Sequence, residues 1–92
     1  MRTTWPTSLE LTKATLEVLI NLGGSCAVND LDREVTLILN LSDELKGKMR
    51  SVNRSEIQYR LAWTRTKAKQ NGLLQRESHR FWSITEKGRG LA

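Results

Sequence analysis

A short basic and aromatic segment near the end of the chain, QRESHRFWSIT, carries the residues best suited to binding an anion. It places two arginines, Arg76 and Arg80, and the only histidine, His79, beside the aromatic pair Phe81 and Trp82. Arginine offers a rigid fork of donors to a phosphate, and histidine can donate as well. No serine or cysteine stands in a relation to His79 that indicates nucleophilic catalysis. The segment therefore predicts a site that binds an anion and catalyses no reaction.

A second set of polar groups falls on one side of a predicted helix that runs from Glu56 to about Asn71. Ser55 and Gln58 form a capping box at its start, and Gly72 is the expected C-terminal cap. Helical spacing separates an apolar inward face from an outward face that is polar, small or basic. The inward face holds Ile57, Leu61, Thr64 and Ala68. The outward face holds Gln58, Tyr59, Ala62, Thr66 and Lys69, with Arg65 and Lys67 at its flanks.

These side chains suit a helix in the major groove of B-DNA, where base edges present donors and acceptors. Gln58 can pair with adenine, although its capping role is an equally open interpretation, and the small Ala62 lets the helix lie close. Arg65 and Lys69 are expected at phosphates, which set affinity and register and carry no sequence information. The expected DNA contacts are Asn53, Arg54, Ser55, Gln58, Tyr59, Ala62, Arg65, Thr66, Lys69, Arg76, His79 and Arg80.

Charge is divided unevenly along the chain. From Met1 to Leu45 three basic residues stand against seven acidic ones, a net charge of −4, whereas from Lys46 to Ala92 twelve stand against three, a net charge of +9. An excess confined to one half indicates a positively charged face that meets a polyanion. An ordinary solvated surface, the alternative, accounts better for scattered charges than for this separation.

Length and composition exclude several classes of protein. The 92 residues, 38% hydrophobic and 27% charged, predict a single globular domain over residues 1–92. No apolar run approaches the roughly 18 residues that cross a bilayer, and the start lacks a signal peptide, so we expect a cytoplasmic protein without membrane contacts. One cysteine, Cys26, and one histidine leave no disulfide and no zinc spacing. We expect Cys26 to be a small buried residue, and we expect no metal, cofactor or catalytic residue.

Capping signals and periodicity divide the first half into short elements. TSLE is a capping box with Thr7 as N-cap, and its helix should run to about Leu22 and stop at the glycines that follow. Its apolar residues fall on two faces, so the spare face is expected to meet a partner chain or a further segment of this one. SCAV, residues 25–28, is expected to be an edge strand, and Asn29 is expected to cap a second helix.

The second half begins with a short turn, SDEL, and a polar stretch, KGKMRSVNR, that predicts a loop. After Gly72 the period changes to two, so LLQR and FWSI predict a hairpin with the four-residue loop ESHR. Trp82 and Ile84 should face the core. Thr85 then caps a helix that ends with the chain, from which we expect a domain excised from a longer protein.

The order of helix, strand, helix, turn, helix and hairpin predicts an α+β, mainly helical fold of the winged helix-turn-helix type, with three helices and a β-hairpin wing. Trp82 and Ile84 would fasten the base of the wing, and its basic tip would reach phosphates. Trp63 lies off the centre of the inward face of the third helix. It leaves two interpretations open: packing against the first helix or the wing, or a surface that stacks on a base.

A run of motifs from Arg60 to Arg89 is similar to a known family. In order they are Arg60-Leu61-Ala62-Trp63, the basic Lys67 and Lys69, Gly72-Leu73-Leu74, Trp82-Ser83-Ile84 and Thr85-Glu86-Lys87-Gly88. In this run the chain resembles the N-terminal domain of the Mrr-type restriction endonucleases, which cut modified DNA. Most of the family-specific weight falls on the segment from Arg60 to Thr66, because the later motifs are common to many winged helices.

The resemblance implies a winged-helix module that delivers a separate nuclease domain to double-stranded DNA, with the third helix in the major groove and the wing on the backbone. Endonuclease activity would then belong to the full-length protein, and the first helix would contact that nuclease domain or a second copy of the chain. Two alternatives stay open: a free-standing winged-helix transcriptional regulator, and a winged-helix protein-interaction module with an incidental basic surface.

Overall fold

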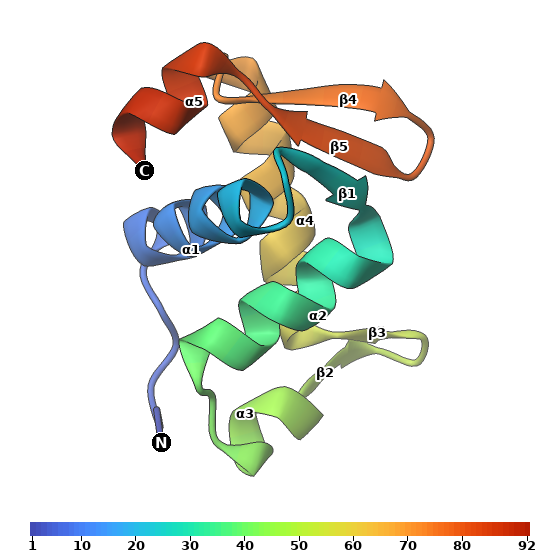
Figure 1. Ribbon diagram of the computed structural model, residues 1–92. Helices are drawn as coiled ribbons and strands as arrows, with labels where there is room; N and C mark the ends of the chain where they lie inside the picture. The colour runs from blue at the N-terminus through green and yellow to red at the C-terminus, as the bar shows by residue number, and fades with distance from the viewer.

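Five helices and two small antiparallel sheets make up the structure, a computed structural model that describes residues 1–92 (Figure 1). The helices are α1 (Ser8–Asn21), α2 (Val28–Leu39), α3 (Asp43–Gly47), α4 (Glu56–Gln70) and α5 (Glu86–Leu91). The strands are β1 (Ser25–Ala27), β2 (Met49–Ser51), β3 (Arg54–Ser55), β4 (Leu74–Ser78) and β5 (Phe81–Ile84). The expectation of a mainly helical α+β fold is confirmed; the predicted turn at SDEL is the short helix α3, and the helix predicted after Thr85 is α5.

The core lies where α1, α2 and α4 pack on one another and on the inner face of the sheet β1-β5-β4. Leu19 of α1 and Val35 of α2 have no accessible surface at all. The four residues predicted for the inward face of α4 are all buried, as the helical period requires. Burying each large aliphatic side chain of this kind stabilises the fold by about 1.5–3 kcal/mol. The position of α4 is therefore fixed by its apolar stripe.

Both predicted capping boxes form. Thr7 and Glu10 exchange bonds at the start of α1, and Ser55 and Gln58 do so at the start of α4. The prediction that Asn29 caps the second helix is wrong, because Ala27 is the N-cap and makes no side-chain bond. The backbone N–H of Val28 donates instead to the carbonyl of Arg80 at 2.7 Å. A tertiary partner therefore replaces the side-chain cap, which sequence alone does not reveal.

The three-stranded sheet has the order β1-β5-β4, so β1 is an edge strand as predicted. Cys26 pairs with Trp82 across it, and both are buried together with Ile84. Burial raises the pKa of the Cys26 thiol, as expected for a small packing residue. The β4–β5 hairpin differs from prediction at its tip: β5 has the predicted bounds, but β4 extends to Ser78, so only residues 79 and 80 lie between the strands, with a bulge in β4.

The segment KGKMRSVNR is not a loop, and this prediction is wrong. Met49–Ser51 and Arg54–Ser55 pair as a second hairpin, β2–β3, whose tip residue Val52 is 93% exposed. The amide of Glu56 donates to the carbonyl of Lys48 at 2.9 Å, which ties the hairpin to the first turn of α4. Figure 1 shows the two hairpins, one at each end of α4, projecting to the same side of the molecule.

The last helix, α5, begins at the N-cap Thr85 as predicted. The hydroxyl of Thr85 accepts from the amide of Gly88 at 3.1 Å and donates to the carbonyl of Gly72 at 2.6 Å. This bond closes the turn after α4, where Gly72 adopts a φ of 76° that favours glycine. None of the helices combines the length and the apolar character that crossing a membrane requires.

Candidate nucleic-acid interface

The outward face of α4 begins with Gln58, which stands next to α2 and the β2–β3 hairpin. Its Oε1 accepts from the amide of Ser55 at 2.9 Å and from the Ser55 hydroxyl at 3.1 Å. The capping role that sequence left open is therefore confirmed. Because these bonds use the oxygen, the amide nitrogen remains as a donor at the surface.

Further along α4, Ala62 is half-buried and Thr66 and Lys69 are exposed. The Thr66 hydroxyl donates to the carbonyl of Ala62 at 3.1 Å, which holds the side chain against the helix. Tyr59 is half-buried, with the guanidinium of Arg50 at 3.9 Å from its ring centroid. The helix thus presents a shallow surface of small and polar groups with a cation near its end.

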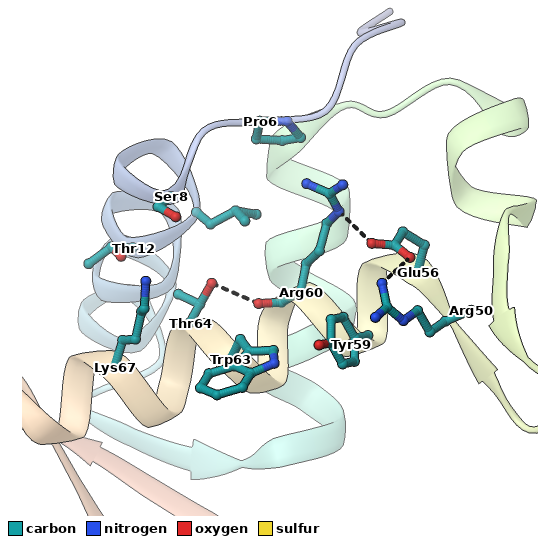
Figure 2. A pocket seen from close by; sticks show the side chains of 11 residues that line it. Pro6, Ser8, Thr12, Arg50, Glu56, Tyr59, Arg60, Trp63, Thr64 and Lys67 are labelled. Carbon is teal, nitrogen blue, oxygen red and sulfur yellow. Dashed lines mark hydrogen bonds and ion pairs between the residues drawn. The ribbon is translucent and has the colours of Figure 1, made fainter.

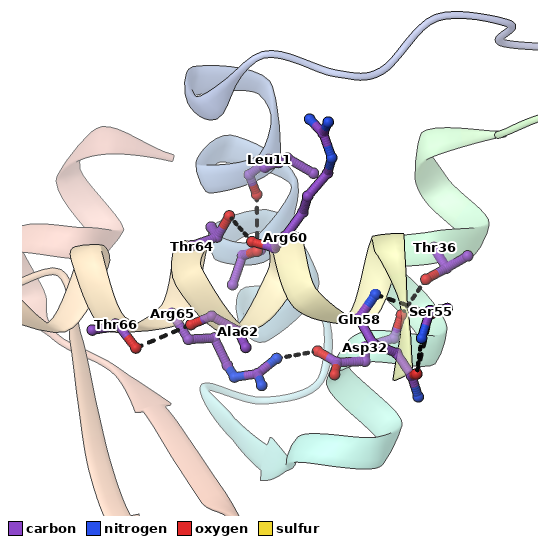
Figure 3. Close-up of polar contacts among 11 residues, drawn as sticks. Leu11, Asp32, Thr36, Ser55, Gln58, Arg60, Ala62, Thr64, Arg65 and Thr66 are labelled. Carbon is purple, nitrogen blue, oxygen red and sulfur yellow. Dashed lines mark hydrogen bonds and ion pairs between the residues drawn. The ribbon is translucent and has the colours of Figure 1, made fainter. Parts of the chain in front are cut away.

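Arg65 lies elsewhere than expected. It is only 9% exposed, and its Nη1 is paired with Asp32 of α2 (Figure 3). Its guanidinium carbon is 5.9 Å from the ring centroid of Trp82. Sequence placed Arg65 at the flank of the outward face as a phosphate contact, whereas in the structure its angular position carries it toward α2 and the base of the β4–β5 hairpin. Its charge joins α4 to α2 inside the protein.

Burial shifts the pKa values of both Asp32 and Arg65 toward their neutral forms. Desolvation raises the pKa of Asp32, although the charges of Arg65 and Arg54 act against that rise. Desolvation likewise lowers the pKa of Arg65, in spite of the attraction of Asp32. Withdrawal from water therefore outweighs mutual attraction for both groups, which is typical of a buried ion pair.

The β2–β3 hairpin carries a basic group at the N-terminal end of α4. Lys48, Arg50, Asn53 and Arg54 are all exposed. Arg50 pairs with Glu56 at 3.5 Å, whereas no carboxylate lies within ion-pair distance of Lys48 or Arg54. Sequence identified Asn53 and Arg54 as candidates but not the hairpin that presents them. The available signal was the alternation in MRS and RS around the turn residue Asn53.

The β4–β5 hairpin carries the second basic group, at the other end of α4. Arg76 donates to the carbonyl of His79 at 2.8 Å and lies 3.1 Å from its Nδ1. Arg76 therefore joins β4 to the two-residue turn at the tip of the hairpin. Arg80 and His79 are exposed at that tip, and no carboxylate pairs with Arg80. The structure thus gives Arg80 a free charge and Arg76 a positioning contact.

Trp63 does not pack into the core. Its side chain is 51% exposed, and it lines an open groove between α4 and the segment around the start of α1 (Figure 2). Sequence left open packing against the first helix or the wing and stacking on a base; the structure places Trp63 in a groove shared with α1 and leaves half of the side chain free for a stacking partner. The spacing of Tyr59, Trp63 and Lys67 at successive helical turns is the signal from which this groove could have been expected.

No three His, Cys, Asp or Glu side chains gather in a way that could hold a metal ion.

A family model described as the Mrr N-terminal domain matches residues 9–92 of the chain. Comparison with the curated proteins and with the solved structures gives no match.

Proposed function

Because the chain belongs to the Mrr N-terminal domain family, we propose that it binds double-stranded DNA as the recognition module of an Mrr-type restriction protein in the cytoplasm. In this proposal the fold is a winged helix-turn-helix, with α2 and α4 as the helix pair and the β4–β5 hairpin as the wing. The cutting reaction would be supplied by a separate nuclease domain of the longer protein.

The observation that carries the proposal is the placement of two basic hairpins at opposite ends of α4 and on the same side of it (Figure 1). A 15-residue helix is about 22 Å long. The major groove of B-DNA, about 12 Å wide, accepts such a helix. Hairpins beyond its two ends would then reach the sugar-phosphate backbones that border the groove.

Within this arrangement the outward face of α4 reads bases and the hairpins hold phosphates. Ala62 and the methyl group of Thr66 suit close apolar contact, for example with a thymine methyl. The free amide nitrogen of Gln58 can donate to a base acceptor, and Tyr59 lies beside it for a base or sugar contact. The phosphate contacts are assigned to cations without an acidic partner and to their neighbours. They are Lys48, Asn53, Arg54, Ser55, Lys69, Arg76, His79 and Arg80.

A protein contact is supported by a different observation. Leu22, Leu37 and Ile38 are exposed large apolar side chains that line one groove where α1 and α2 end. Adjacent apolar groups of this kind mark interaction surfaces. We assign this face to the nuclease domain of the same chain or to a second copy. A free-standing regulator would use the same DNA contacts, so it is family membership that favours the restriction protein.

The test is duplex binding measured by fluorescence anisotropy across a range of salt concentrations. Five cationic phosphate contacts, from Lys48, Arg54, Lys69, Arg76 and Arg80, predict a slope of log K against log salt of roughly −4.5. Lys69→Ala should reduce that slope by about 0.9, whereas Arg65→Met should leave it unchanged because Arg65 is paired inside the protein. Lys13→Ala, an equal loss of charge on α1, is the matched control.

Duplexes with and without N6-methyladenine or 5-methylcytosine form a second arm of this test. Gln58→Ala should alter discrimination between duplexes more than the salt slope, since base contacts specify and phosphate contacts position. Two results would refute the proposed interface and favour the protein-interaction module. One is a Kd that does not change with salt, and the other is an equal loss of affinity in Lys13→Ala and Lys69→Ala.

A further inference from the structure

The groove beside Trp63 is a second site with its own chemistry. It has a volume of about 470 Å³, within the range of pockets that hold small molecules. Figure 2 shows Tyr59, Trp63 and Lys67 along one side of α4, with Arg50 and Glu56 at one end. Gln58 is not part of its lining and contributes instead to openings toward α2. The groove therefore lies to one side of the proposed major-groove surface.

Trp63 supplies an aromatic surface that the protein leaves uncovered. It is 51% exposed, whereas Trp82, in the core, is 8% exposed. Cations stack on Trp5, Tyr59 and Trp82, but none stacks on Trp63. An uncovered indole in a groove offers dispersion and π-stacking to a flat ring, and nucleobases of every kind have such a face.

The charge of the groove favours an anion. Three cations, Arg50, Arg60 and Lys67, line it with a single carboxylate, Glu56. Glu56 is already engaged, since one oxygen accepts from Arg60 Nε at 2.8 Å and the other pairs with Arg50 at 3.5 Å. Lys67 has no acidic partner and follows Trp63 by one helical turn, about 5–6 Å away. A flat ring on Trp63 would therefore place a linked phosphate near a free ammonium group.

We propose that this groove binds a single nucleotide, with the base stacked on Trp63 and the phosphate held by Lys67. The nucleotide is either free in solution or a unit of a DNA strand that is not base-paired. This site does not rest on duplex binding by the outward face of α4, because the two share only Tyr59 and the ligand of the groove is an unpaired nucleotide. An acidic peptide would satisfy the cations but would leave the indole without a stacking partner.

The test is a titration of the full chain with deoxyadenosine 5′-monophosphate, followed by the indole N–H signals in proton–nitrogen correlation spectra. The three tryptophans give three signals, and that of buried Trp82 serves as an internal reference. The Trp63 signal, identified by its loss in Trp63→Leu, should move saturably while that of Trp82 stays in place. Calorimetry should then show binding weakened about tenfold by Trp63→Leu and several-fold by Lys67→Gln. Lys13→Gln, outside the groove, should bind as the unsubstituted protein does.

Binding measurements with fragments of the nucleotide and with a single-stranded oligonucleotide separate the remaining outcomes. Deoxyribose 5-phosphate and deoxyadenosine should each bind more weakly than the whole nucleotide, because each lacks one half of the recognition. A short single-stranded oligoadenylate that binds more tightly than the mononucleotide identifies a strand as the source, and equal affinity identifies the free nucleotide. Movement of all three indole signals alike, an unchanged affinity in Trp63→Leu, or a response to an acidic peptide alone would overturn the proposal. Duplex binding measured in parallel keeps this result separate from the proposed function.

Discussion

Removing one partner of the Asp32–Arg65 pair is expected to destabilise the fold more than removing both. The pair joins α2 to α4, and the side chains of Arg65 and Asp32 retain only 11% and 24% of their accessible surface. A single replacement leaves one buried charge without its partner, whereas a double replacement by apolar residues removes both desolvation costs. The variants are Asp32→Leu, Arg65→Met and the combination of the two.

The structure sets the size of each effect. Breaking a buried ion pair costs about 3–5 kcal/mol when one charge is stranded. Asp32→Leu strands the more deeply buried Arg65, so we expect about 3 kcal/mol. Arg65→Met strands a carboxylate whose pKa is already raised and which can take up a proton, so we expect about half that loss. The double variant should lie within about 1 kcal/mol of the unsubstituted protein, which corresponds to a coupling energy of at least about 3.5 kcal/mol.

Urea unfolding followed by circular dichroism measures these free energies, and thermal unfolding checks them. For a domain of this size, 3 kcal/mol corresponds to a fall in Tm of roughly 10–20 °C. The sign of the pH dependence adds a second check. Because the folded protein raises the pKa of Asp32, its contribution to stability is greatest below the pKa of the unfolded chain and is lost as pH rises. The free energy of unfolding, relative to Asp32→Asn, should therefore fall as pH increases above about 4. Additive single-variant losses would refute the reasoning.

Three further predictions follow from local geometry. Gly88→Ala should cost about 1–3 kcal/mol because the added methyl would come within 2.8 Å of Ile84 Cγ1, whereas Gly90→Ala in the same helix meets nothing within 4 Å; thermal unfolding compares the two. Bonds from the Thr7 backbone and from Arg2 lower the pKa of Glu10 below 4.5, so stability relative to Glu10→Gln should be lost as pH falls below that value, measured by urea unfolding. The raised pKa and burial of Cys26 should make its alkylation by iodoacetamide much slower in the folded protein than in urea, measured by mass spectrometry.

Sequence predicted best those features that depend on local signals. The two capping boxes, the buried stripe of α4 and the inward Trp82 and Ile84 each follow from a few neighbouring residues whose spacing has one physical meaning. The turn of the β4–β5 hairpin was harder to predict, because the ends of its strands are fixed by cross-strand hydrogen bonds that no local signal in the sequence reveals. The N-cap of α2 was missed for the same reason, since the acceptor that satisfies Val28 comes from Arg80.

Among the interface candidates, Arg65 shows why a helical projection is insufficient. Its place at the edge of the outward face suited a phosphate contact, but the nearness of Asp32 on α2 depends on how the two helices cross. Trp63 is a second case, since an aromatic residue near an apolar face is usually buried, yet α1 leaves it half uncovered. The burial of Arg65 and the exposure of Trp63 both depend on how the helices pack against one another. Lys69 and Thr66 are exposed in the structure, as their place on the outward face predicted.

The ends of α4 determine where both basic hairpins lie. At its start, Glu56 bonds the carbonyl of Lys48 and pairs with Arg50, so the β2–β3 hairpin moves with the first turn of the helix. At its end, the amide of Leu73 donates to the carbonyl of Ala68 at 2.9 Å, and Leu73 in turn accepts from Thr85 at 3.0 Å, which carries the β4–β5 hairpin. The proposed phosphate contacts are thereby arranged before any partner arrives, and little ordering remains for binding to impose. The apolar stripe of α4 consequently determines the geometry of the interface, while the residues on its outward face determine only what that geometry can recognise.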